Sequence, residues 1–156
     1  MVSQEKLDDV YLNIASKIAT LSRATRAKVG AIIVKNYQII AEGFNGTPSG
    51  LNNSCEYIDT NHIKYTKPEV IHAEMNCILK LGSSTQSARG ATLYTTYGPC
   101  IECAKSIIQV GIIRVCYLYD YHSKAGTDLL IIAGLNVEKF SNNFNDNSNY
   151  AEATIY

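Results

Sequence analysis

Two short motifs place metal-binding side chains in distant parts of the chain. The first is His72-Ala73-Glu74 and the second is Pro99-Cys100-Ile101-Glu102-Cys103. One imidazole and two thiolates can hold a Zn²⁺ ion and leave its fourth position open. An open position is typical of catalytic zinc, because structural zinc is normally closed by four protein ligands. The chain must therefore fold so that the two motifs meet at one point, and we expect a reactive centre there.

Each motif stands at the expected start of a helix. The sequence patterns predict helices over about residues 72–81 and 100–110. One helical turn brings Cys100 and Cys103 to the same side of their helix, and His72 begins the other helix. Both positive helix ends would then face the ion and favour thiolate over thiol.

Other interpretations of the cysteines and histidines stay open at this stage. A Cys-x-x-Cys pair also occurs in redox proteins, and the zinc could be purely structural. Cys55 and His62 could supply a fourth ligand or a separate zinc site. Cys77 and Cys116 stand among apolar residues and are expected to be buried thiols.

Glu74 is expected to move protons and not to bind the ion. A carboxylate two residues from the imidazole can reach a water molecule at the open position. The alternative is an exposed glutamate, which the helix dipole favours at a helix start.

Composition limits what else the chain can do. Its 156 residues, 46% of them hydrophobic, suit one domain with a substantial core. The formal net charge of zero argues against nucleic-acid binding, which relies on clustered Lys and Arg, but is compatible with a local pocket for one phosphate. The N-terminus lacks the features of a secretory signal, and no apolar run could span a bilayer. With five cysteines, an odd number, we expect a reduced, cytoplasmic protein without a membrane partner.

Local patterns predict an α/β fold. Residues 4–21 have helical spacing, with a buried stripe of Leu7, Val10, Tyr11, Ile14, Ile18 and Leu21. Strands are expected at 29–34, 38–44, 91–95, 112–118 and 135–140, the first two as a hairpin, and a further helix at about 126–133. This alternation predicts a largely parallel sheet packed between helices, made mixed by the hairpin. Residues 45–69 are expected to be irregular.

The domain is expected to cover residues 1–140. The remaining residues, 141–156, form an asparagine-rich tail, either mobile or docked on a neighbour through Phe144, Tyr150 and Tyr156.

The motifs together resemble the cytidine deaminase superfamily, and within it the deoxycytidylate (dCMP) deaminase branch, over about residues 5–140. The resemblance rests on the two metal-binding motifs, on the Ala104-Lys105-Ser106-Ile107-Ile108-Gln109 continuation of the second, on Val29-Gly30-Ala31, and on Gly43-Phe44-Asn45-Gly46-Thr47-Pro48. It implies a three-layer sandwich with a five-stranded mixed sheet between helices.

The resemblance also implies hydrolytic conversion of dCMP to dUMP with release of ammonia. Zinc held by His72, Cys100 and Cys103 would activate water, and Glu74 would carry protons to N3 and to the leaving amine. Main-chain groups at Ala73, Gly98 and Cys100 would contact the base edge.

Further site residues follow from the same resemblance. Asn45 corresponds to a sugar-binding asparagine, although an Asn-Gly pair is also a common turn. Arg26 is the candidate for the phosphate, with Lys28 and Tyr121 as second choices; the alternative for Arg26 is a solvated loop charge. Two departures from the family pattern are Phe44, where tyrosine is frequent, and Gly98, where serine is frequent.

Regulation and assembly are implied as well. Many dCMP deaminases are hexamers, activated by dCTP and inhibited by dTTP, with Mg²⁺ a candidate companion of the triphosphate. Here the candidate effector residues are Phe44, Gly46, Thr47 and Lys28. Two other functions remain open: a deaminase of free cytidine or of a tRNA base, and a catalytically silent zinc protein that acts as a scaffold or nucleotide sensor.

Overall fold

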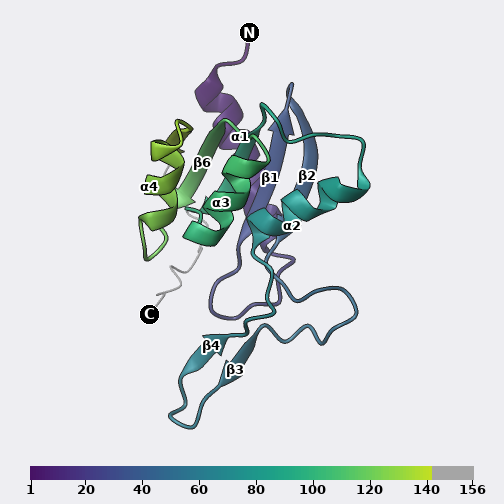
Figure 1. Cartoon of the computed structure of the whole chain (residues 1–156), viewed down its shortest axis with the longest axis vertical. Coiled ribbons are helices and arrows are strands. Elements are labelled where there is room, and N and C mark those ends of the chain that lie inside the picture. The colour runs from purple at the N-terminus through teal and green to yellow at the C-terminus, as the bar shows by residue number, and fades with distance from the viewer. Residues whose placement is uncertain (142–156) are drawn as a thin grey trace.

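A mixed five-stranded sheet forms the centre of the computed structural model, which describes residues 1–141 (Figure 1). The strand order is β2-β1-β5-β6-β7. The strands are β1 (Gly30–Lys35), β2 (Gln38–Phe44), β5 (Thr92–Tyr97), β6 (Arg114–Tyr119) and β7 (Asn136–Lys139). β1 is antiparallel to β2 and to β5, whereas β5, β6 and β7 run parallel to one another. The predicted mixed sheet is therefore confirmed.

Helices cover both faces of this sheet and complete three layers. They are α1 (Gln4–Ala19), α2 (Ala73–Lys80), α3 (Ile101–Gln109) and α4 (Ala125–Ile132), with a short 3₁₀ turn η1 (Leu81–Ser83) after α2. In Figure 1, α2, α3 and α4 lie in front of the sheet and α1 lies behind it. Within the described residues, no helix is long and apolar enough to cross a membrane.

The sheet has a hydrophobic core on each face, and strand β1 contributes side chains to both. Because successive side chains of a strand point to opposite faces, Ile32 and Val34 pack with α1, while Ala31 and Ile33 pack with α2 and α3. The run is buried on both sides, as expected of a central strand. The sequence signal was accordingly a continuous apolar run and not an alternating one.

The buried stripe of α1 differs from the predicted one. Tyr11 is buried as expected, and Leu7, Ile14 and Ile18 pack against the same core. Leu12 and Ala15 are buried as well, whereas Val10 and Leu21 are exposed. The cause is a close crossing over β1: a Cβ on Gly30 would stand 2.1 Å from the Ala15 carbonyl oxygen. Small residues are needed at such a crossing, so Ala15 and Ala19 are buried although the pattern of large apolar residues did not include them.

The segment predicted to be irregular contains a second, small sheet. Strands β3 (Glu56–Ile58) and β4 (Lys64–Thr66) pair antiparallel, with Glu56 opposite Thr66. The hairpin projects below the main body in Figure 1. Residues 45–69 thus carry an ordered arm, and the prediction of an irregular segment was wrong for this part.

A polar network fastens α1 to the parallel half of the sheet. Arg114 on β6 donates to both carboxylate oxygens of Asp8, at 2.9 and 2.7 Å, and also pairs with Glu138. Tyr94 donates its hydroxyl to Asp8 at 2.8 Å. Burial alone would raise the pKa of Asp8, but the hydrogen bonds from Arg114, Gln4 and Tyr94 outweigh burial and lower it.

Stability should depend on this carboxylate at low pH. Because the pKa of Asp8 is lowered in the folded state, its contribution is complete above the unfolded value of about 3.9 and is lost as the pH falls below it. We expect Asp8→Asn to lower the free energy of unfolding at pH 7 by about 3 kcal/mol, as for a broken buried pair. Urea unfolding should show the difference in unfolding free energy between wild type and Asp8→Asn narrowing as the pH falls below about 4.

Asp9→Asn is the matched control, since the Asp9 carboxylate accepts a hydrogen bond from Asn13 on the same helix and is not part of the Arg114 network. Metal loss at low pH affects all three proteins alike, so the difference between them reports Asp8. A gap of constant size from pH 7 to pH 3 would contradict the assignment.

Helix α4 meets the start of α3 at very close range. A Cβ on Gly126 would stand 2.0 Å from the Pro99 carbonyl oxygen and 2.6 Å from the Cys100 carbonyl carbon, so Gly126→Ala must push these backbones apart. We expect a cost of about 1–3 kcal/mol and a fall in bound zinc per chain, measured by thermal unfolding and elemental analysis. Gly82→Ala is the control, because a Cβ there meets nothing within 4 Å.

Candidate active site

The starts of α2 and α3 meet beside the sheet, as the motifs required. His72 is the N-cap residue of α2 and Cys100 is the N-cap residue of α3, and neither side chain caps its own helix. Both side chains are therefore turned to other partners. Cys103 stands one turn further along α3 and is buried.

The three predicted donors are close enough to share one ion. His72 Nδ1 lies 3.3 Å from Cys100 Sγ and 3.5 Å from Cys103 Sγ. Tetrahedral zinc with ordinary Zn–N and Zn–S bonds separates such donor atoms by about 3.5 Å. The geometry and the nitrogen-and-sulfur chemistry of the set both fit Zn²⁺.

Electrostatics within the donor set also favour a cation. The hydrogen bond from Cys103, together with that from His72, holds the pKa of Cys100 well below its usual value, against the effect of burial. The hydrogen bond to Cys100 raises the pKa of His72 and, with burial, that of Cys103. Without a metal, Cys100 is thus a thiolate, and His72 and Cys103 carry protons beside it. A divalent cation bound by the three groups would replace these protons.

Two of the alternative interpretations can now be judged. No fourth His, Cys, Asp or Glu of residues 1–141 joins this donor group, so a closed four-ligand site is not present there. Cys55 lies at the base of the β3–β4 hairpin, while His62 is in the turn at its tip. Three residue pairs of strand separate them, about 10 Å, so the two do not share an ion.

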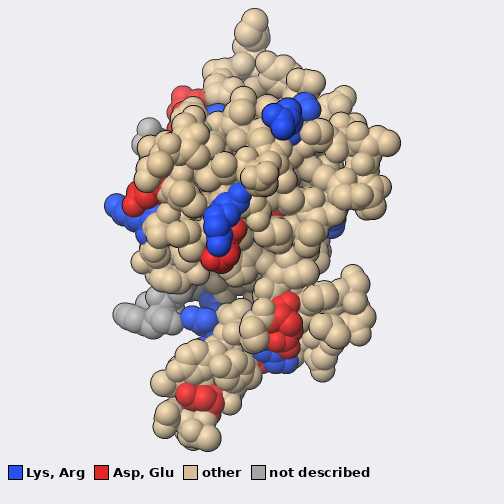
Figure 2. Space-filling model, in the orientation of Figure 1, with Lys and Arg blue, Asp and Glu red and all other residues tan. Residues whose placement is uncertain are grey.

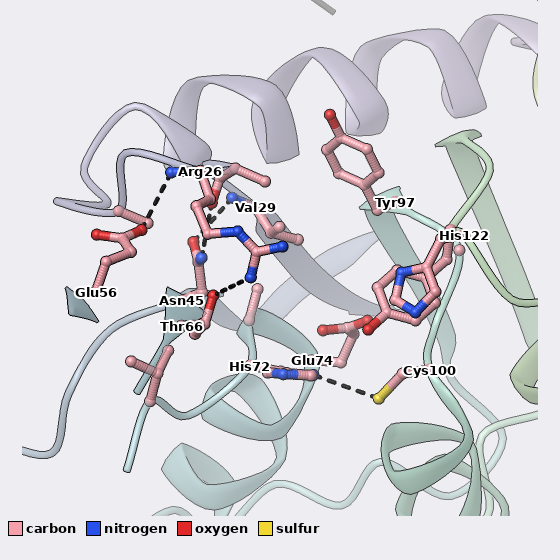
Figure 3. Close-up of a pocket in the computed structure, with 16 residues that line it drawn as sticks. Arg26, Val29, Asn45, Glu56, Thr66, His72, Glu74, Tyr97, Cys100 and His122 are labelled. Atoms are coloured by element: carbon pink, nitrogen blue, oxygen red, sulfur yellow. Dashed lines mark hydrogen bonds between the residues drawn. The ribbon is translucent and has the colours of Figure 1, made fainter. Parts of the chain in front are cut away.

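Glu74 is buried and not a surface residue. It stands in the first turn of α2 with 4% of its surface exposed, and Figure 3 shows its carboxylate beside His72 and directed into the pocket. Burial raises the pKa of Glu74 to about 7, against the lowering effect of its own backbone N–H and of His72. A carboxyl with such a pKa can both accept and donate a proton near neutral pH.

A pocket of about 190 Å³ opens over Glu74 and the donor set (Figure 3). Its wall includes most of the residues predicted for substrate binding, namely Arg26, Asn45, Ala73, Gly98 and Tyr121. The pocket lies where β5 and β6 end, which is the usual place for ligands in open parallel sheets. The phosphate, sugar and base candidates thus share one cavity with the metal donors.

Asn45 connects the pocket wall to the preceding loop through hydrogen bonds to the backbone and to Ser22. Its side-chain oxygen accepts the Val29 N–H at 2.8 Å, its amide nitrogen donates to the Ala27 carbonyl at 2.9 Å, and its carbonyl accepts the Ser22 hydroxyl at 2.8 Å. These bonds hold the loop between α1 and β1 against the end of β2. Asn45 therefore positions the loop that carries Arg26.

The remaining candidates lie outside the pocket wall. Lys28 is exposed, and the pocket lining does not include Phe44, the last residue of β2, or Gly46 and Thr47, which follow it. Gly46 forms a two-way backbone bridge with Ile71, the residue before His72. The candidate effector segment is thus hydrogen-bonded to the chain directly before a metal donor.

Four polar or aromatic wall residues were not predicted from the sequence: Glu56, Thr66, Tyr97 and His122. Tyr97 is the last residue of β5 and His122 follows β6, and their position at the carboxyl edge of the parallel strands was a usable signal. Glu56 and Thr66 gave no such signal, because strands of three residues have too few side chains to show alternation.

A second cluster of acidic and sulfur side chains does not have the character of a metal site. Asp8, Cys116 and Glu138 offer donor atoms close together, but the guanidinium of Arg114 pairs with both carboxylates. Because Arg114 already neutralises the two carboxylates, the cluster does not require a metal cation.

Comparisons with known proteins agree with the site. The family model described as the cytidine and deoxycytidylate deaminase zinc-binding region matches residues 5–119. The deoxycytidylate deaminase of Enterobacteria phage T4 is 32% identical, over 81% of this chain and 86% of the relative. That of Homo sapiens is 33% identical, over 89% and 85%.

A solved structure is similar over nearly the whole fold. The dCMP deaminase from the cyanophage S-TIM5, in complex with dCMP and dUMP, superposes with a TM-score of 0.83 at 38% identity, covering 89% of this chain and all of that one. Sequence, fold and donor geometry agree, and the chain belongs to the cytidine and deoxycytidylate deaminase family.

Proposed function

We propose that the protein is a zinc-dependent dCMP deaminase, which hydrolyses dCMP to dUMP and ammonia. The observation that carries the proposal is the buried carboxyl of Glu74 beside the His72, Cys100 and Cys103 donors in one pocket. The cyanophage relative, whose structure holds dCMP and dUMP, supports the choice of substrate.

When bound by the three donors, Zn²⁺ supplies a Lewis acid that makes a water molecule nucleophilic near neutral pH. The carboxylate of Glu74 takes a proton from the attacking water and delivers it to N3 of the cytosine ring. The oxygen becomes bonded to C4, the C4–N4 bond breaks, and Glu74 passes the second proton to the departing nitrogen. Ammonia leaves, a carbonyl replaces the amine, and the carboxylate of Glu74 is regenerated.

Main-chain groups would orient the base. Ala73 begins α2 and is fully buried at the pocket wall, where Gly98 and Cys100 also lie. Gly98 donates its N–H to the Tyr119 carbonyl, so its carbonyl is the group offered to the cytosine amine. Fixed backbone dipoles of this kind stabilise developing charge without reorganisation.

Sugar and phosphate would lie toward the loop between α1 and β1. Asn45 offers an amide beside that loop for the sugar hydroxyl, and Arg26 offers a guanidinium, which suits a phosphate through paired hydrogen bonds. Tyr121 also lines the pocket and lies beside His122, with the two ring centroids 4.0 Å apart and the rings tilted by 42°. On the face shown in Figure 2, basic side chains stand apart from one another, several of them beside acidic ones. That distribution suits a single-phosphate ligand better than a nucleic-acid strand.

The proposal is tested by ammonia release. We expect turnover of dCMP to exceed that of cytidine and of a tRNA anticodon stem, and Glu74→Gln to lower kcat by roughly 10²–10⁴-fold with zinc content unchanged. Glu102→Gln is the control, since Glu102 is an exposed first-turn glutamate of α3. Near-normal turnover by Glu74→Gln contradicts the proton-transfer role, and zinc-loaded protein without ammonia release indicates a scaffold or sensor.

Regulation is a further part of the proposal. The backbone bridge between Gly46 and Ile71 connects the candidate effector segment to the chain before His72. We expect dCTP with Mg²⁺ to activate and dTTP to inhibit, and the protein to be a hexamer in solution. If neither triphosphate changes the rate of dCMP deamination, the proposed regulation is wrong. Light scattering measures the oligomeric state.

A further inference from the structure

We infer that Glu56 and Thr66, the facing residues at the base of the β3–β4 hairpin, position Arg26 and thereby set the preference for a phosphorylated over an unphosphorylated nucleoside. The inference rests on the proposed function, in which Arg26 meets the 5′-phosphate. Neither hairpin residue needs to touch the substrate for this role.

The hairpin holds Arg26 at two places (Figure 3). Glu56 Oε1 accepts the backbone N–H groups of Thr25 and Arg26, at 2.8 and 3.1 Å. At the other end of the residue, Arg26 Nη1 donates to Thr66 Oγ1 at 3.0 Å. Because Glu56 and Thr66 are direct cross-strand partners, one rigid pair fixes both the main chain and the guanidinium.

The loop in turn holds the hairpin. The Lys64 ammonium donates a hydrogen bond to the Thr25 hydroxyl at 3.0 Å. At the base of the hairpin, the backbone N–H of Lys67 donates to the carbonyl of buried Cys55. An isolated two-stranded hairpin is marginally stable in water. The hairpin and the loop between α1 and β1 therefore stabilise one another across the pocket mouth.

Positioning matters because arginine has many rotamers. Holding its side chain in one geometry before the substrate arrives removes the ordering cost from binding. The carboxylate of Glu56 would repel a nearby phosphate, so its presence in the wall needs a reason. Accepting two consecutive backbone N–H groups supplies that reason, and it requires an acceptor oxygen but not a full negative charge.

The test compares kcat and KM for dCMP and for deoxycytidine across matched variants. Glu56→Ala and Thr66→Val each remove one hold on Arg26, and Arg26→Gln removes the guanidinium. We expect the two hairpin variants to lower the selectivity ratio, kcat/KM for dCMP over that for deoxycytidine, by roughly fivefold to tenfold, mainly through KM. Glu56→Gln and Thr66→Ser keep an acceptor in place and should restore most of the ratio.

Glu69→Gln and Thr60→Val are the controls, because both residues are exposed and lie outside the pocket wall. Zinc content and melting temperature verify that each variant is folded. An unchanged ratio in both Glu56→Ala and Thr66→Val, with Arg26→Gln losing it, overturns the inference and leaves the proposed function intact. A wild-type protein without dCMP turnover, or an Arg26→Gln variant with an unchanged ratio, overturns both the phosphate assignment and the inference.

Discussion

The structure depends on the meeting of two helix starts at one edge of the sheet. α2 and α3 are far apart in sequence, yet their N-cap residues, His72 and Cys100, stand within hydrogen-bond distance. Both helices present unsatisfied N–H groups and a positive end to the same point. Negative sulfur and carboxylate groups are stabilised there, and a cation makes the arrangement favourable. Sheet, helices and loops all fix the directions of these two helices.

The close packing around this point explains why glycine stands at positions 43 and 126. Gly126 lets α4 touch Pro99 and Cys100, and Gly43 lets β2 pass the backbone of α2 at Ala73 and Cys77. Each helix that bears a metal donor is therefore in backbone contact with a neighbouring element. Positional precision at the site results from this contact, because interiors packed at such density transmit small displacements.

The sequence predicted the grouping of the three donor side chains more completely than the pocket wall around them. His72, Cys100 and Cys103 could be identified because zinc allows few donor types and few spacings, and the alternating elements were sufficient for the three-layer fold. Glu56 and Thr66 could not be identified, since their roles arise from a cross-strand pair in strands too short to show a pattern. The buried stripe of α1 was misplaced for a different reason, the close crossing at Gly30, which depends on tertiary contact. Local patterns carry information about local chemistry, and pocket walls are built from distant pairs.

The β3–β4 hairpin is one continuous insertion in the chain between β2 and α2. Its residues reach the pocket from outside the sheet and contribute nothing to the five paired strands. In the proposed function, the residues that position Arg26 and the residues that hold the metal therefore lie in separate stretches of the chain. Insertions, deletions or replacements in this hairpin could therefore change the preferred nucleotide during evolution without altering the residues of the hydrolytic centre.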